Sequence, residues 1–293
     1  MCLEGNIVFV EGLNKGRFPF SNSLLVKGLR KNMLIDVGAG FDVLIRFKDR
    51  VDLVVITHLH PDHFALSYLF KGRKVYVPVV ESKYRRLLDL AYRYVGKELA
   101  DTWLSLVKNV MKARDPYFTD VYEEGDVFDL GGVKIHPIHV PGHTVGHHVI
   151  LIGDSIVYGA DIDLTGFGPW YGHVESDVEE FKKSIRKVME LKPEIYVSGH
   201  KPPVKGREKI LEELERYLGK FDETKMKILD ALKEPKSLDE LVKMNLIYRR
   251  KPYAQKLLEY WERNMILHNL RLLLERNIIE KTEDGKYMVK VEV

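Results

Sequence analysis

Three histidines and one aspartate stand within the six residues 58–63, which read His-Leu-His-Pro-Asp-His. They follow the largely apolar run 52–56, which has the composition of a buried strand. In extended backbone His58 and His60 project from the same side, and Asp62 and His63 come where the chain turns toward a helix. Imidazole nitrogens combined with carboxylate oxygens suit zinc, whereas a packed core has no reason to collect them. The segment therefore predicts a metal site just beyond a strand.

Four residues at one strand end cannot fully coordinate two metal ions, so a site with two ions needs further ligands. Candidates for them follow later in the chain. His143, Asp161 and His200 each come shortly after a β-branched run, at 133–140, 156–158 and 195–197 respectively. Each run predicts a strand, so each of these side chains is expected on a loop or turn just past a strand end.

The order HxHxDH, then His, Asp and His, each after a strand, resembles the metallo-β-lactamase superfamily over residues 5–220, and in particular its glyoxalase II and RNase Z type of dinuclear site. The resemblance implies an α/β fold, a four-layer αββα sandwich, with two zinc ions per chain. The implied metal ligands are His58, His60 and His143 for one ion, Asp62, His63 and His200 for the other, and Asp161 between them. It also implies that Asp36, in the segment Asp36-Val37-Gly38, supports the metal loops from behind.

Composition sets limits on the environment of the protein. The chain has 293 residues, a net charge of +3 and 45% hydrophobic residues, which suits one large domain and a small one. There is no apolar run long enough to span a membrane and no signal peptide at residues 1–5, and Cys2 is the only cysteine, so no internal disulfide forms. We therefore expect a cytoplasmic protein without a membrane partner; a homodimer is compatible with the sequence.

Two segments are candidates for binding substrate. The loop at 162–174 follows Asp161 directly and carries Trp170, Tyr171 and His173, which predicts a substrate wall, the alternative being aromatic residues that only pack. Lys201 follows His200 and is a candidate for an anionic group, the alternative being a surface lysine. The segment 81–118 is basic, helical in its pattern over 81–113, and is predicted to be an insertion that either caps the substrate or presents a solvated face.

The C-terminal part is predicted to be a separate unit, so we divide the chain into domains 1–221 and 222–293. A helix is expected to stop at Gly219, and three helical segments then precede a hairpin around 283–285. This order resembles the winged-helix-like domain of lactamase-β-like endoribonucleases. Its sharpest basic cluster is 248–251, a candidate phosphate contact or a solvated loop.

These motifs together predict a dinuclear zinc hydrolase that uses a metal-bridging hydroxide on a carboxylic ester or thioester, with Asp62 as the residue that orients the nucleophile. Two alternatives stay open. The first is a metal-dependent endoribonuclease or phosphodiesterase, which the basic helices and the C-terminal domain favour and which would make RNA the substrate. The second is a non-catalytic, metal-sensing regulator that binds nucleic acid.

Overall fold

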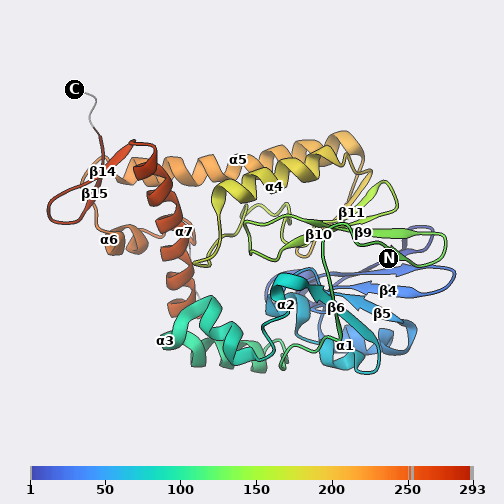
Figure 1. The fold of residues 1–293 in the computed structure, drawn as a ribbon. Coiled ribbons are helices and arrows are strands. Elements are labelled where there is room, and N and C mark those ends of the chain that lie inside the picture. Colours follow the sequence, from blue (N-terminus) through green and yellow to red (C-terminus); the bar gives the residue numbers. More distant parts are fainter. Residues whose placement is uncertain (1, 250, 252–253, 291–293) are drawn as a thin grey trace.

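The computed structural model describes residues 2–249, 251 and 254–290, and its centre is a pair of sheets that face each other (Figure 1). The first sheet has seven strands in the order β1-β2-β3-β4-β5-β6-β7. These strands are β1 (Cys2–Glu4), β2 (Ile7–Val10), β3 (Ser23–Lys27), β4 (Asn32–Ile35), β5 (Leu53–Val55), β6 (Lys74–Pro78) and β7 (Asp120–Tyr122).

The second sheet has six strands in the order β13-β12-β11-β10-β9-β8. They are β8 (Phe128–Asp129), β9 (Lys134–His139), β10 (His148–Ile152), β11 (Ile156–Tyr158), β12 (Ile195–Val197) and β13 (Val204–Lys205). Strands β4, β5 and β6 run parallel in one sheet, and β11 and β12 run parallel in the other. Parallel neighbours end at the same edge, which brings the loops that follow them together.

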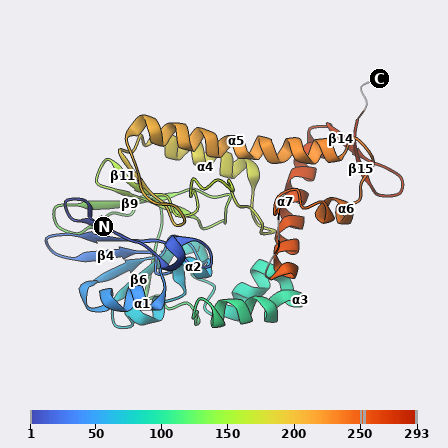
Figure 2. The ribbon, with the colours of Figure 1, turned by 180° about the vertical axis from the view of Figure 1, so that it is seen from behind.

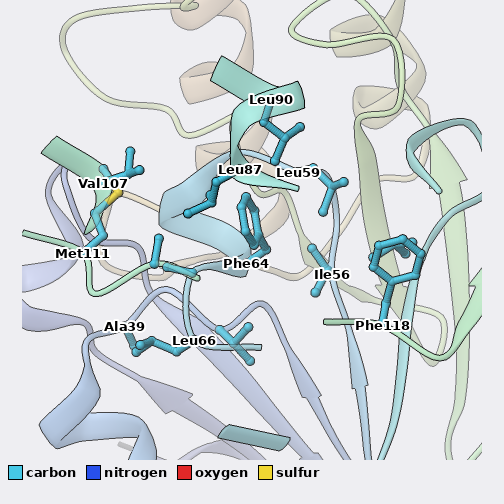
Figure 3. Close-up of a cluster of buried hydrophobic side chains, with 14 of the residues drawn as sticks. Ala39, Ile56, Leu59, Phe64, Leu66, Leu87, Leu90, Val107, Met111 and Phe118 are labelled. Carbon is cyan, nitrogen blue, oxygen red and sulfur yellow. The ribbon is translucent and has the colours of Figure 1, made fainter. Parts of the chain in front are cut away.

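Three hydrophobic cores separate four layers, which confirms the predicted αββα sandwich. One core fills the space between the sheets, with Ile35 and Val55 facing Ile150 and Val197. A second lies between the second sheet and the helices α4 (Val178–Glu190) and α5 (Arg207–Ala231). The third covers the outer face of the first sheet, beneath α1 (Phe41–Leu44), α2 (Pro61–Phe64) and α3 (Leu87–Asn109) (Figure 3).

The predicted helical segment 81–113 is shorter and bent in the structure. A short 3-10 turn covers Val79–Glu81, and α3 then runs from Leu87 to Asn109 with a break at Gly96, where φ is 71° and ψ is 174°. Glycine tolerates this left-handed conformation, so the helix changes direction there without steric cost. The apolar side of α3 joins the core shown in Figure 3, where Leu87, Leu90 and Val107 are labelled.

The C-terminal part differs from the prediction at its start. Helix α5 does not stop at Gly219 but continues to Ala231, because the helix buries Tyr217, Phe221 and Ile228 along one side and nothing forces it to end. It is followed by α6 (Leu238–Lys243), α7 (Gln255–Glu275) and a hairpin of β14 (Ile279–Lys281) and β15 (Tyr287–Val289), as the sequence predicts. The capping box of Ser237 and Glu240 opens α6.

Helix α7 returns to the sandwich. It extends from the region of α5 to α3, across the end of both sheets (Figures 1 and 2). Its residues Leu257, Leu258 and Trp261 belong to the same core as α3. The division of the chain at residue 221, the insertion at 81–118 and the winged-helix-like character of 222–293 stay predictions.

Within the described part of the chain, no helix combines the length and the apolar character needed to cross a membrane. The cytoplasmic location stays a prediction.

Candidate metal centre and substrate cavity

All seven predicted metal ligands come together at one edge of the sandwich. His58, His60, Asp62 and His63 follow β5, His143 follows β9, Asp161 follows β11 and His200 follows β12. Six of them are buried and His200 is half-buried. They form two groups whose ligand atoms lie within 4.8 Å of one another: His58, His60, His143 and Asp161 in one, and Asp62, His63 and His200 in the other.

The two carboxylate oxygens of Asp161 face different groups. Oδ2 lies 2.9 Å from Nε2 of His143, 3.6 Å from Nε2 of His58 and 3.8 Å from Nδ1 of His60. Oδ1 lies 2.8 Å from Nε2 of His63 and 3.4 Å from Nε2 of His200. Asp161 therefore stands between the two groups, in the place that a shared ligand requires.

The second group closes through Asp62, whose Oδ2 lies 3.4 Å from Nε2 of His200. The backbone carbonyl of Asp62 accepts a hydrogen bond of 2.6 Å from the hydroxyl of Ser21. This contact fixes the first turn of α2, and with it the position from which the carboxylate enters the site.

Several of these atoms suit metal ligation because they are buried and have no hydrogen-bond partner among the described residues. Nε2 of His58, Nε2 of His63 and Oδ1 of Asp161 are buried without a hydrogen-bond partner among the described residues. His63 and Asp161 are close, but their contact does not have the direction of a hydrogen bond. Since buried polar atoms are nearly always hydrogen-bonded, unpaired nitrogen and oxygen atoms that converge in this way suit a metal ion.

The electrostatics of the first group favour metal binding. Burial lowers the pKa of His58 well below its usual value and that of His60 to about 3, so both imidazoles stay neutral and able to donate a lone pair. Burial opposes ionisation of Asp161, but His63 and His143 hold the pKa of that carboxyl well below its usual range. Burial likewise opposes protonation of His200, whose pKa the carboxylates of Asp161 and Asp62 raise to about 9.

Hydrogen bonds from behind orient the histidines. Nδ1 of His143 donates to the carbonyl of Trp170 at 2.8 Å, and Nδ1 of His200 donates to the carbonyl of Gly16 at 2.8 Å. Nδ1 of His63 donates to Oδ2 of Asp36 at 2.6 Å. Each bond places an N–H on the outer nitrogen and directs Nε2 at the site, where it offers a lone pair once the ring is neutral.

His60 uses the opposite nitrogen, and His173 explains why. Nδ1 of His173 donates to the carbonyl of Tyr94 at 3.2 Å, which leaves Nε2 of the neutral ring as an acceptor. That atom lies 2.7 Å from Nε2 of His60. His60 therefore donates from Nε2 and presents the lone pair of Nδ1 to the site, so His173 acts as a positioning residue for His60.

Asp36 supports both sides of the motif, and we expect Asp36→Asn to lower metal affinity about 10- to 100-fold. Besides His63, this carboxylate accepts from the backbone N–H of Thr57 at 2.8 Å and from its hydroxyl at 2.9 Å. Asparagine tolerates the φ of +57° at this position but offers only one acceptor oxygen. Competition with a chromogenic chelator measures the affinity.

The control for Asp36→Asn is Asp52→Asn, because Asp52 is exposed and also accepts a backbone hydrogen bond, from Asn32 at 2.7 Å. Equal metal affinities of the two variants would contradict the role of Asp36.

The four predicted substrate residues have different positions. Trp170, His173 and Lys201 line a cavity of about 610 Å³ beside the metal ligands. The side chain of Lys201 is engaged, since it pairs with Glu213 at 2.6 Å and donates to the carbonyl of Leu164. Tyr171 is not among the residues that line this cavity; it is buried, packs against Phe221 and accepts a hydrogen bond from Asn269.

Most of the cavity wall was not predicted from the sequence. Three apolar elements build it: α3 and the residues that follow it, the N-terminal half of α7, and the loop after Asp161. The residues concerned are Trp103, Leu106, Val107, Met111, Leu258, Trp261 and Phe167. A polar edge is formed by Lys15 and Arg17, which are exposed and pair with no acidic side chain among the described residues. Helical spacing shows that α3 and α7 have apolar faces, but only their meeting places those faces at the site.

Of the basic cluster 248–251, Tyr248 lines the cavity, where its hydroxyl accepts a hydrogen bond from Nε1 of Trp170. Lys251 forms a buried ion pair with Glu262. Arg250 lies outside the described residues.

A two-sheet sandwich with clustered histidines and carboxylates at one edge defines a metal-binding hydrolase fold. The family model of the metallo-beta-lactamase superfamily matches residues 16–200, and the chain belongs to that superfamily. The predicted enzyme class, a hydrolase of this superfamily, is confirmed at that level, and its His and Asp cluster is suited to binding metal.

Three relatives and one solved structure are similar to this chain. A beta-lactamase-like protein 2 homolog of Caenorhabditis elegans is 22% identical, over 94% of this chain and 84% of its own length. A hydroxyacylglutathione hydrolase of Acidiphilium cryptum is 29% identical over 56% of each chain, and an acyl-coenzyme A thioesterase of Gallus gallus is 25% identical over 58% of this chain and 67% of its own. The crystal structure of a metallo-beta-lactamase family protein from Thermus thermophilus has a TM-score of 0.73 at 18% identity, covering 97% of this chain and 99% of that one, which shows a shared fold.

Proposed function

We propose that this chain is a dinuclear zinc-dependent hydrolase of carboxylic thioesters. The observation that carries the proposal is the position of Asp161, whose two oxygens face two separate groups of ligands at the edge of a largely apolar cavity. In this proposal His58, His60 and His143 hold one zinc ion, and Asp62, His63 and His200 hold the other. Asp161 is their common ligand.

The protein residues divide the work between binding and orientation. Bound zinc supplies Lewis acidity and lowers the pKa of water toward about 7. Asp62 lines the cavity, so its carboxylate is placed to accept a hydrogen bond from the attacking water and to orient it. Trp170 and His173 form the adjoining wall, where they limit the access of bulk water and hold the substrate carbonyl near the ligands.

Two facts favour a thioester. The relatives include a hydroxyacylglutathione hydrolase and an acyl-coenzyme A thioesterase, both of which act on thioesters according to their names. The cavity wall contributed by α3 and α7 is apolar, which suits an acyl group and offers little to the phosphate groups of RNA. The phosphodiesterase and regulator alternatives are outcomes of the experiment below.

Removal of metal is expected to abolish turnover. We expect chelation to lower hydrolysis of an S-acylglutathione by at least about 100-fold and zinc to restore it, since the ligand set has no other nucleophile or Lewis acid. The measurement compares the thioester with a labelled structured RNA, each before and after metal removal that elemental analysis has verified.

Three other outcomes would each contradict the proposed function. Full thioester hydrolysis by metal-free protein would overturn the proposal. Metal-dependent RNA cleavage with an intact thioester would assign the phosphodiesterase alternative. Binding of nucleic acid that persists without metal, with neither substrate cleaved, would assign the regulator.

A further inference from the structure

The cavity has a polar side and an apolar side, and their separation indicates how a substrate lies in it. On the polar side, the loop of Lys15 and Arg17 adjoins His200, which donates a hydrogen bond to the carbonyl of Gly16 at 2.8 Å. On the apolar side, the ring of His60 lies 5.8 Å from that of Trp170, which in turn lies 5.7 Å from that of Trp261 on α7. The cavity therefore leads from exposed cations, past the metal ligands, to an apolar end.

The apolar end is closed by segments that are distant in sequence. Helix α3 contributes Trp103, Leu106 and Val107, and α7 contributes Leu258 and Trp261. These belong to one continuous core, in which Figure 3 shows Val107 beside Met111. We call this part of the cavity the α3–α7 chamber; its aliphatic and indole surfaces offer burial to hydrocarbon and few hydrogen bonds.

The C-terminal segment is held against the site by hydrogen bonds. Nδ2 of Asn264 donates to the carbonyl of Gly172 at 2.8 Å, and Nε2 of His268 donates to the carbonyl of His173 at 2.7 Å. These bonds join α7 to the loop that follows Asp161, whose His173 positions His60. The C-terminal segment is thus part of the substrate wall.

We propose that the α3–α7 chamber binds the apolar acyl chain of the substrate, and that the loop of Lys15 and Arg17 receives the anionic thiol portion. This inference rests on the proposed thioester hydrolysis and specifies its substrate as an amphipathic acyl thioester. It also gives residues 222–293 a role in acyl-chain selection in place of nucleic-acid reading.

The first test is a series of S-acylglutathiones from acetyl to decanoyl. For the wild-type protein we expect kcat/KM to rise about fourfold for each methylene that the chamber buries, until the chamber is full. Leu106→Trp fills the chamber, so we expect it to lower the ratio of decanoyl to acetyl kcat/KM by at least about tenfold.

The control is Leu104→Trp, since Leu104 is also a half-buried leucine of α3 that packs on the same core but does not line the cavity. We expect it to keep the wild-type ratio. Hydrolysis of the whole S-acylglutathione series without any dependence of kcat/KM on chain length would contradict acyl-chain binding in the chamber and leave the proposed function intact. Equal ratios in the two variants would contradict it in the same way.

A second test needs no turnover. All three tryptophans of the sequence, Trp103, Trp170 and Trp261, line the cavity, so binding inside it changes the intrinsic fluorescence. We expect the thioether S-decylglutathione to bind at least about tenfold more tightly than S-methylglutathione, and Leu106→Trp to reduce this difference. Equal affinities would overturn the chamber even if every thioester were hydrolysed, whereas absence of hydrolysis with a retained difference would overturn only the proposed function.

Discussion

Replacing Asp161 with asparagine is expected to lower kcat/KM for thioester hydrolysis by about a thousandfold or more. The side chain keeps its volume but loses its charge and one of its two acceptor oxygens. In the present structure those oxygens serve different ligand groups, at 2.9 Å from His143 and 2.8 Å from His63. An amide cannot present lone pairs to both sides, so the variant is also expected to retain less metal than the wild-type protein.

Metal content by elemental analysis and steady-state kinetics on the same sample measure this effect. Asp154→Asn is the control, because Asp154 is an exposed residue of the turn between β10 and β11, close in sequence and outside the site. Wild-type turnover and metal content in Asp161→Asn would remove Asp161 from the ligand set and end the dinuclear assignment.

Gly38→Ala is expected to destabilise the protein by about 3 kcal/mol or more. A Cβ atom at this position would lie 1.4 Å from the backbone oxygen of Asp62, a distance that no change of rotamer relieves. The same carbonyl accepts the hydrogen bond from Ser21, so any shift that relieves the clash also moves a predicted metal ligand. We therefore expect thermal unfolding to begin about 6 °C or more below the wild-type temperature, with a parallel loss of metal affinity.

Gly219→Ala is the matched control and is expected to have the opposite sign. Gly219 lies inside α5, and a Cβ added there would meet no atom within 4 Å. Alanine in a helix interior is favoured over glycine by about 0.5–1 kcal/mol, so this variant should unfold at a slightly higher temperature. A wild-type melting temperature in Gly38→Ala would show that the loop after β4 is looser than its close contact with Asp62 indicates.

The prediction for Gly38 depends on the way in which two neighbouring loops of the first sheet are joined. Asp36 and Gly38 follow β4, while the HxHxDH motif follows the neighbouring parallel strand β5. The backbone contact between Gly38 and Asp62 and the hydrogen bonds from Thr57 and His63 to Asp36 join the two loops. The candidate metal ligands after β5 are thus oriented by the edge of the sheet before a metal ion binds, which reduces the entropy that binding has to overcome.

The sequence by itself indicated the superfamily and the candidate ligand residues. The motif around His58 is local, and each further donor follows an apolar run of strand composition, so position past a strand end could be predicted without knowing how the strands pair. The superfamily resemblance that these motifs carry implied the αββα layers, which the three cores confirm. Position past a strand end was sufficient to group these candidate ligands, because parallel strands end at the same edge of a sheet.

Only the tertiary structure decided the rest. That His60 uses Nδ1 depends on His173 and Tyr94, which come from a distant loop and from α3. The chamber depends on contact between α3 and α7, and the continuation of α5 past Gly219 depends on the core beneath it. The burial of Tyr171 could not be predicted from the sequence either. An aromatic residue in a loop beside the site has the same sequence pattern whether its side chain faces the cavity or the core. Packing between residues far apart in the chain, and not their order, settles such questions.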